Sequence, residues 1–288
     1  MSKYARNSLG LLLAAALVAL PTLTHAVLKP LELSDAASLA NSLGGLEEYP
    51  DANSVTGLDR TYIEFDETGA YEEYNHTFTK ALTEEGRDGN STVSLNYHRR
   101  YGFVEIVMAR VIKADGSEVV VGEELITEGT PPEVSAMNIF EEDFRQISVV
   151  FPGLEVGDAI EYIVHQSYEP LIDNGFNGIY FLQSVEPIVE SRVTIIGPSS
   201  LPLVHVVKNG EAEYEETIDG DRTVHAWTTR GMPKIERELA MAPPRQIAAR
   251  LIVSTMPTWE EMSRYFWKLV DDKCVAEESL VDLVAEIT

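Results

Sequence analysis

The stretch from residue 190 to residue 198 reads Glu-Ser-Arg-Val-Thr-Ile-Ile-Gly-Pro and carries the pattern that decides the fold. Arg192 and Thr194 point to one side of an extended chain, and Val193 and Ile195 point to the other. The stretch therefore predicts a strand with one buried face. The closing Gly-Pro pair predicts the end of the strand, because proline cannot donate a hydrogen bond to a sheet.

Short runs of this kind fill the chain on both sides, from Tyr62 to Tyr265. They are rich in Val, Ile, Tyr, Phe and Thr, and they lack the alternation with long helices that predicts a parallel sheet. We therefore expect an all-β fold, an antiparallel two-layer β-sandwich. Turn-forming residues separate the runs at 66–69, 88–90, 115–116, 209–210 and 219–221. Several of these turns should connect the strands of hairpins.

The pattern becomes helical after Pro257. Thr258 can accept a hydrogen bond from the backbone N–H of Glu261, whose carboxylate can reach back, and this capping box predicts the start of a helix. We expect a short helical C-terminal tail whose apolar face needs a packing partner. Two apolar stripes have helical spacing, one at Trp259, Met262, Phe266, Leu269 and Val270 and one at Leu280, Leu283, Val284 and Ile287.

The first residues predict export. Lys3 and Arg6 precede an apolar run from Leu9 to Leu20, and small residues lead to Ala26. This is the composition of a secretory signal peptide, and the run is shorter than the roughly 20 residues that span a bilayer as a helix. We expect cleavage after Ala26 and a periplasmic or secreted product. A retained anchor is the alternative.

These patterns divide the chain into four segments: a signal peptide at 1–26, a leader at 27–49, the β-sandwich domain at 50–250, and a linker with helices at 251–288. The leader should hold a short helix that is capped by Ser34 or Asp35 and ended by the Gly-Gly pair at 44 and 45. The proline-containing segment from Met232 to Arg250 should form an extended connector between the sandwich and the helices.

Charge and cysteine content exclude some functions. The chain has 22 Lys and Arg against 47 Asp and Glu, a formal net charge of −25. Such a surface repels nucleic acid and anionic membranes, so we expect neither as a partner.

Cys274 is the single cysteine, and its acidic neighbours should raise the pKa of its thiol, which argues against a role as a nucleophile. A stand-alone cysteine enzyme would need a histidine within hydrogen-bond reach of Cys274.

The residues suggest no catalytic, cofactor-binding or metal site. The histidines lack metal-site spacing, and the sequence has no phosphate-binding loop, dinucleotide fingerprint or nucleophile elbow. The Asp-Gly-Asp tip at 219–221 suits calcium but lacks the full set of acidic positions. Clustered aromatic residues predict core or sheet-surface packing, with sugar stacking as the alternative, at Tyr62, Phe65, Tyr71, Tyr74, Phe78, Tyr97, Tyr101 and Phe103.

Two motifs carry a resemblance to a known family. Residues 110–116 read Arg-Val-Ile-Lys-Ala-Asp-Gly, and residues 150–162 read Val-Phe-Pro-Gly-Leu-Glu-Val-Gly-Asp-Ala-Ile-Glu-Tyr. With the segment Ser-Thr-Met-Pro-Thr-Trp-Glu-Glu at 254–261, they resemble a domain of unknown function that precedes transglutaminase-like domains in bacterial envelope proteins. Shorter matches in the same order lie at Leu182, Gln183, Pro187, Arg192 and Trp227.

The resemblance implies an exported immunoglobulin-like β-sandwich that is followed, in longer relatives, by a papain-like core with a Cys-His-Asp triad. The nucleophile of that core lies well beyond the Trp-Glu-Glu helix, so no catalytic residue is carried over to Cys274. We expect a non-catalytic module associated with a transglutaminase-like enzyme whose core is missing from this chain. That core would be its intramolecular partner in a longer parent protein. The alternative is a self-sufficient binding module for a glycan or protein of the bacterial envelope.

Overall fold

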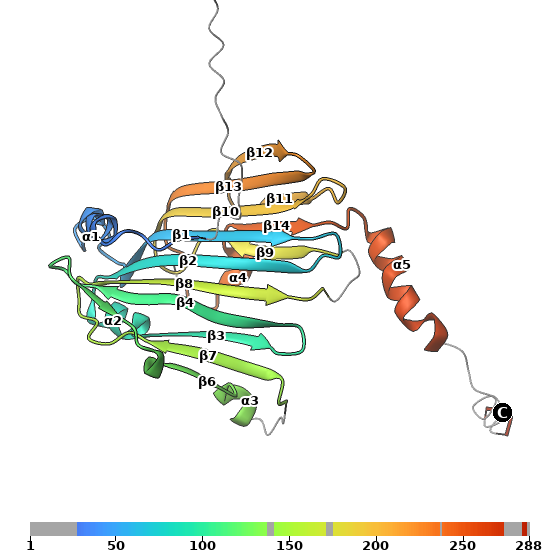
Figure 1. Ribbon diagram of the computed structural model, residues 1–288, viewed down its shortest axis with the longest axis horizontal. Coiled ribbons are helices and arrows are strands. Elements are labelled where there is room, and N and C mark those ends of the chain that lie inside the picture. Colours follow the sequence, from blue (N-terminus) through green and yellow to red (C-terminus); the bar gives the residue numbers. More distant parts are fainter. Residues whose placement is uncertain (1–27, 137–140, 171–174, 237, 274–283, 287–288) are drawn as a thin grey trace, which may run out of the picture.

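The computed structural model describes residues 28–136, 141–170, 175–236, 238–273 and 284–286. The predicted signal peptide, Cys274 and most of the second helical stripe lie outside these residues. Within them, no helix is long and apolar enough to cross a membrane. Strands dominate, as predicted, and they form one eight-stranded sheet and two three-stranded sheets (Figure 1).

The eight-stranded sheet, the large sheet below, has the order β12-β13-β10-β1-β2-β8-β4-β5. Its strands are β1 (Ser54–Phe65), β2 (Tyr71–Ala81), β4 (Gly102–Ile112), β5 (Glu118–Val120), β8 (Ala159–Tyr168), β10 (Ile188–Pro198), β12 (Glu213–Asp219) and β13 (Arg222–Met232). Adjacent strands of this sheet run antiparallel, except that β1 and β10 pair in parallel, with Thr61 opposite Val193. The prediction of purely antiparallel pairing is wrong here because the long chain between β1 and β10 can bring β10 back in the same direction.

The small sheets and the helices complete the fold. One small sheet has the order β3-β7-β6, and the other has the order β11-β14-β9. Their strands are β3 (Thr92–His98), β6 (Ile126–Gly129), β7 (Phe144–Val150), β9 (Asn177–Phe181), β11 (Val204–Lys208) and β14 (Arg250–Ser254). The helices are α1 (Leu33–Ser42), α2 (Glu84–Asn90), α3 (Pro132–Ala136), α4 (Pro244–Ile247) and α5 (Trp259–Val270), with 3-10 turns at Glu123–Leu125 and Asp271–Lys273.

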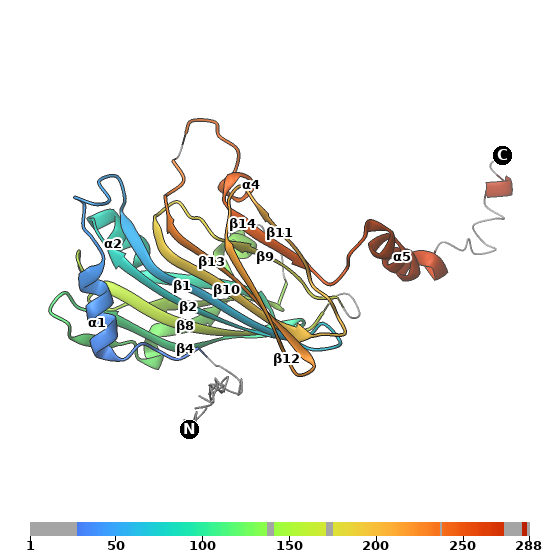
Figure 2. The same cartoon turned by 90° about the horizontal axis from the view of Figure 1, so that it is seen from above.

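The large sheet has a different cover on each face. On β4, Ile112 packs in a core with α1, whereas its neighbour Val111 packs in a core with β7. Successive strand residues point to opposite faces, so α1 and the β3-β7-β6 sheet lie on opposite sides. The β11-β14-β9 sheet packs on the large sheet around Ile63 and Trp227, as Figure 2 shows. The predicted predominantly β fold with antiparallel sheets is confirmed, and the immunoglobulin-like topology stays a prediction.

Strand β10 confirms the burial pattern of residues 190–198 but not the predicted end. Val193 and Ile195 are buried, as expected. The strand continues through Pro198, and Gly197 has a packing role instead of breaking it. A Cβ at Gly197 would lie 1.9 Å from Cζ of Phe65, so the absence of a side chain lets the Phe65 ring lie against the strand.

Three of the predicted turns form hairpins. They connect β1 to β2, β4 to β5, and β12 to β13. Gly69, Gly116 and Gly220 adopt positive φ angles of 89°, 85° and 63° in them, which is why turn residues occur there. The turn at 209–210 instead joins β11 to β12, which belong to different sheets, so the hairpin prediction is wrong at that position.

The predicted hairpin at 88–90 is also wrong, because these residues end helix α2. The hydroxyl of Thr83 accepts a hydrogen bond from the backbone N–H of Gly86 at 3.1 Å and caps the helix. Glu84 and Glu85 occupy the first turn, where carboxylates are favourable to the helix dipole. A local cap thus overrides the turn preference of Asp, Gly and Asn.

The segments outside the main strands match the predictions in part. Helix α1 forms in the leader, but it begins at Leu33, so Ser34 and Asp35 lie inside the first turn instead of capping it. The connector after Met232 leads to strand β14 and not to the helices, so strand structure continues past residue 250. Helix α5 starts as predicted, and Thr258 accepts from the N–H of Glu261 at 3.3 Å.

Candidate functional site

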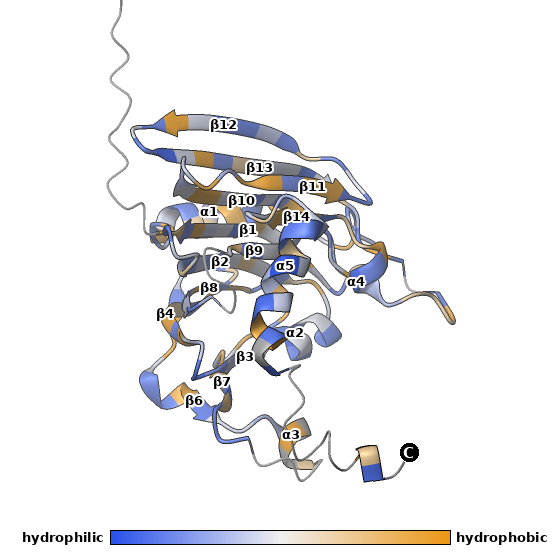
Figure 3. Cartoon of the chain, turned by 90° about the vertical axis from the view of Figure 1, so that its right-hand side faces the viewer, coloured by the Kyte–Doolittle hydropathy of each residue, from blue (hydrophilic) through white to orange (hydrophobic). Residues whose placement is uncertain are grey.

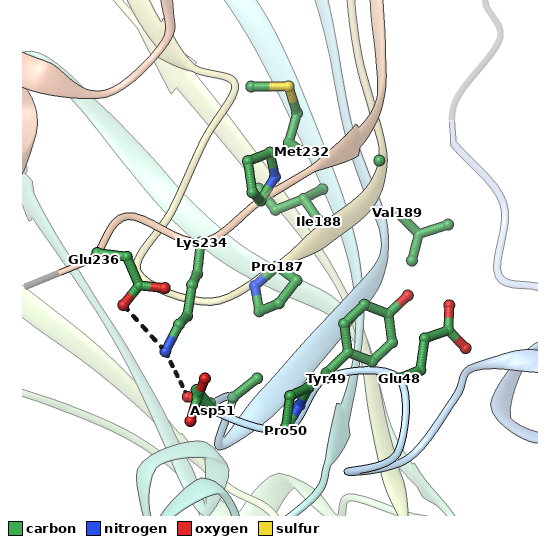
Figure 4. A pocket seen from close by; sticks show the side chains of 13 residues that line it. Glu48, Tyr49, Pro50, Asp51, Pro187, Ile188, Val189, Met232, Lys234 and Glu236 are labelled. Carbon is green, nitrogen blue, oxygen red and sulfur yellow. Dashed lines mark hydrogen bonds and ion pairs between the residues drawn. The ribbon is translucent and has the colours of Figure 1, made fainter.

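A pocket of about 540 Å³ lies where the leader meets the start of β10 and the segment that follows β13 (Figure 4). Its volume falls in the range typical of small-ligand sites. The end of the leader and the residues just after it contribute residues 48–52. The end of β13 and the segment after it contribute residues 231–234 and Glu236. Its walls are largely apolar, formed by Tyr49, Pro50, Pro187, Val189, Met232 and Pro233.

Lys234 joins the two sides of this pocket. Its ammonium group donates to the backbone carbonyl of Asp51 at 2.6 Å and lies 3.5 Å from a carboxylate oxygen of Glu236. Figure 4 shows the lysine between these two partners. Burial and the neighbouring Glu48 carboxylate raise the pKa of Tyr49, so its phenol stays protonated and can donate a hydrogen bond at neutral pH.

The chemistry of the pocket suits binding. Among the described residues that line it, Lys234 is the one cation, against Glu48, Asp51 and Glu236. This balance disfavours an anionic ligand and allows a neutral or cationic one. Serine, cysteine, threonine and histidine are absent from the described lining.

A second cluster of charged residues lies on the α1 side of the large sheet and is almost fully buried. Glu161 is 0% exposed and His76 is 1% exposed. Nε2 of His76 lies 2.8 Å from one Glu161 oxygen, and Nε of Arg110 donates to the other at 2.9 Å. Burial alone would raise the pKa of Glu161, but its hydrogen bonds with His76, the N–H of Leu31 and Arg110 outweigh that effect and lower it.

This cluster, the Glu161 cluster below, holds the leader on the sheet. The N–H of Leu31 donates to Glu161 at 2.9 Å, and Nη2 of Arg110 donates to the carbonyl of Leu31 at 2.6 Å. Lys80 adds a contact at the end of α1, where its ammonium donates to the carbonyls of Ala40 and Leu43. Both backbone groups of one leader residue are therefore bound by buried charges.

The other charged residues of the two motifs also bind each other. Lys113 pairs with the buried carboxylate of Asp158 and donates to the carbonyl of Gly153. Asp158 in turn accepts from the N–H groups of Ala114 and Glu155 at 2.9 and 2.8 Å. Motif residues 110–116 and 150–162 thus meet on neighbouring strands and turns, where they stabilise the scaffold.

The sequence match to a known family covers both motifs. The family described as "Domain of Unknown Function with solved-structure structure (DUF3857)" matches residues 67–236, more than half of the chain. The chain belongs to the DUF3857 family. This confirms the family part of the resemblance, and the association of this DUF3857 chain with a transglutaminase-like domain stays a prediction. No curated protein matches the sequence.

A solved structure shows a similar fold at low sequence identity. A crystal structure of a "putative protease" from Parabacteroides distasonis is 18% identical, with a TM-score of 0.65 over 81% of this chain and 49% of that chain. This DUF3857 chain therefore spans about half the length of that protein. The M1 zinc metallopeptidase from Deinococcus radiodurans is 11% identical over 70% of this chain and 42% of that one, and its TM-score of 0.39 carries no argument.

The histidines of this DUF3857 chain have structural contacts. His76 belongs to the Glu161 cluster, and His165 stacks on Tyr74 with ring centroids 4.4 Å apart. Rings of His205 and His225 pack around Trp227. Cys274 lies outside the described residues, so its distance from these histidines stays untested.

One group of side chains could hold a metal ion. Ligand atoms of His98, Glu141 and Asp143 all lie within 4.8 Å of one another at the surface. Oxygen and nitrogen ligands of this kind suit a divalent cation, although exposed acidic groups commonly meet without one. Sequence reasoning missed this group because His98 is far from the acidic run in the chain and no spacing rule connects them.

Half of the predicted aromatic cluster is core. Tyr62, Phe65, Phe78 and Tyr97 are buried, which confirms packing as their main role. Tyr101 and Phe103 are exposed. Few rings are therefore available for sugar stacking, and the pocket is the better candidate for ligand binding in this DUF3857 chain.

Proposed function

We propose that this chain is an exported, non-catalytic module with an immunoglobulin-like β-sandwich. It would position, or recognise partners for, a transglutaminase-like enzyme with a papain-like Cys-His-Asp core that is missing from this chain. The main observation behind this proposal is the set of contacts that the charged residues of the family motifs make. Arg110, Lys113, Asp158 and Glu161 are bound to one another and to backbone groups, which supports a scaffold role for these motifs.

Two further findings support this proposal. The chain spans about half of the solved structure that shares its fold, and a further domain would account for the difference. Helix α5 is capped, yet it exposes Trp259, Phe266 and Trp267. An amphipathic helix of this kind gains stability when its apolar stripe packs on another element.

The gene sequence beyond the codon for Thr288 tests the association. We expect the reading frame to continue into a region that encodes a cysteine, a histidine and an aspartate with the spacing of a papain-like core. A stop codon followed by an intergenic gap would overturn the proposal. Export is tested separately, because N-terminal sequencing of the mature protein from the periplasm or medium should begin at Val27.

The pocket favours a second function, a binding module for a neutral or cationic envelope glycan or peptide. Neutral oligosaccharides of N-acetylglucosamine and short basic peptides can be titrated against the 288-residue chain while the methyl signal of Met232 is followed by NMR. Tyr49→Ala should abolish any saturable shift, and Tyr101→Ala, at an exposed ring away from the pocket, should not. Equal loss of the shift in both variants would argue against the pocket as the binding site.

A further inference from the structure

The outer face of the β11-β14-β9 sheet is apolar and exposed. The register places Val206, Ile252 and Ile179 side by side across its three strands. Ile179 is 58% exposed and Val206 41% exposed, and Phe181 and Val204 extend the patch at 45% and 43%. Contiguous exposed apolar side chains on a folded protein mark an interaction site.

The inner face of the same sheet already has its partner. Leu251 and Val253 of β14 point inward and are buried in the core with Trp227. Ile252, between them, points outward. Strand β14 thus has an apolar inner face and also places an apolar residue at the centre of its outer face. A sheet face that stays in water usually carries polar residues at the outward positions.

Charge distinguishes this face from the rest of the surface. The chain carries 47 acidic residues, yet the outward positions of the three strands include none. Two of these positions are basic, Lys208 and Arg250. The outward positions are Asn177, Ile179, Phe181, Val204, Val206, Lys208, Arg250, Ile252 and Ser254. A complementary partner has an apolar centre and carboxylates beside it.

The path of the chain indicates which partner could cover this face. Residues 255–258 alone separate β14 from α5. The start of α5 therefore lies near the sheet, and any domain that follows α5 is tethered to this end of the molecule, at an effective concentration that a free partner rarely reaches. In Figure 3, hydrophobic colour marks β11, and α5 lies in front of this end of the molecule.

We propose that the outer face of the β11-β14-β9 sheet is the docking surface for the domain that follows α5 in the longer protein. This rests on the function proposed above and adds the place of contact. Docking there would hold the second domain in one orientation, whereas a domain attached through α5 alone would move freely. The contacting surface of that domain would be apolar, with acidic residues opposite Lys208 and Arg250.

Hydroxyl-radical footprinting with mass spectrometry tests this contact. Oxidation rates of Ile179 and Phe181 would be compared between the 288-residue chain and the protein from the full reading frame. We expect several-fold slower oxidation of both in the longer protein. Ile218 on β12, which is 69% exposed, should react equally in both and serves as the control. Ile179→Glu in the longer protein should restore the oxidation of Phe181, and Ile218→Glu should not.

Three outcomes would overturn the contact, and they separate it from the proposed function. Unchanged oxidation of Phe181 in a longer protein with a Cys-His-Asp core leaves the function standing and removes the docking surface. Protection of Phe181 that rises with the concentration of the 288-residue chain, together with a dimer mass, makes a second copy the occupant. A reading frame that ends at Thr288 overturns both.

Discussion

Replacing Glu161 with Gln should destabilise the protein and release its leader. Glu161 accepts from Arg110, His76 and the backbone of Leu31 while it is fully buried. Removing one partner of a buried ion pair costs about 3–5 kcal/mol because the other charge stays desolvated. Glu118 still pairs with Arg110 at 2.8 Å, so we expect a loss of about 3 kcal/mol, the lower end of that range.

Two measurements check the effect of Glu161→Gln. Urea denaturation should show the fall in the free energy of unfolding, and hydrogen exchange should show faster exchange of the Leu31 amide. Glu67→Gln, at an exposed turn position, is the control and should stay within about 0.5 kcal/mol of the parent. A loss below about 1 kcal/mol, the size of an ordinary hydrogen bond, with unchanged protection of Leu31 would refute the reasoning.

The same cluster allows a double-mutant test. Combining Glu161→Leu with Arg110→Met removes both charges of the ion pair, so neither a carboxylate nor a guanidinium stays buried without the other; His76 and the N–H of Leu31 lose their acceptor, as they do in Glu161→Leu alone. The double variant should therefore be more stable than Arg110→Met alone, because apolar replacement of a complete buried pair is often neutral. Additive losses would show that Arg110 and Glu161 contribute to stability independently, and would contradict this reasoning.

Three further changes test other features. Burial raises the pKa of Asp59 from 3.8 to about 6, so the folded state binds the proton more tightly than the unfolded state. Stability should therefore fall as pH rises from 4 to 6, by up to about 3 kcal/mol. Asp59→Asn should remove this dependence, and a urea midpoint that changes with pH equally in the variant and the parent would contradict it. Gly197→Ala forces a Cβ against Phe65 and should cost about 1–3 kcal/mol, whereas Gly129→Ala, with open space around it, should be tolerated. Thr258→Ala should weaken the start of α5 by about 1 kcal/mol, and unchanged exchange of the Glu261 amide would contradict the cap.

Local sequence patterns predicted the strands and three of the hairpins, but not the long-range pairing of the strands. Alternation over residues 190–198 correctly separates buried from exposed positions, because burial of one face is a property of the strand itself. The parallel pairing of β1 with β10 depends on where the intervening strands go, and no local pattern encodes that. Gly197 shows the same limit, since its role depends on the Phe65 ring from a distant strand.

The pocket and the Glu161 cluster were also beyond sequence reasoning. The pocket unites Tyr49 of the leader with Pro187 and Lys234, which lie far along the chain and form no motif. Arg110 and Glu161 were found through the family resemblance, but their buried pairing follows from the register of β4 and β8. A charged residue in a half-buried strand could have signalled it, because charges there need a partner.

Arg110 shows why these family motifs do not themselves indicate an active site. Its Nε and Nη2 groups donate to Glu161, its Nη1 group donates to Glu118, and Nη2 also reaches the carbonyl of Leu31. A guanidinium committed in this way cannot also bind a substrate anion without breaking a buried ion pair. This is consistent with our proposals that recognition depends on two surfaces that the motifs hold in place, the pocket beside the leader and the outer face of the β11-β14-β9 sheet.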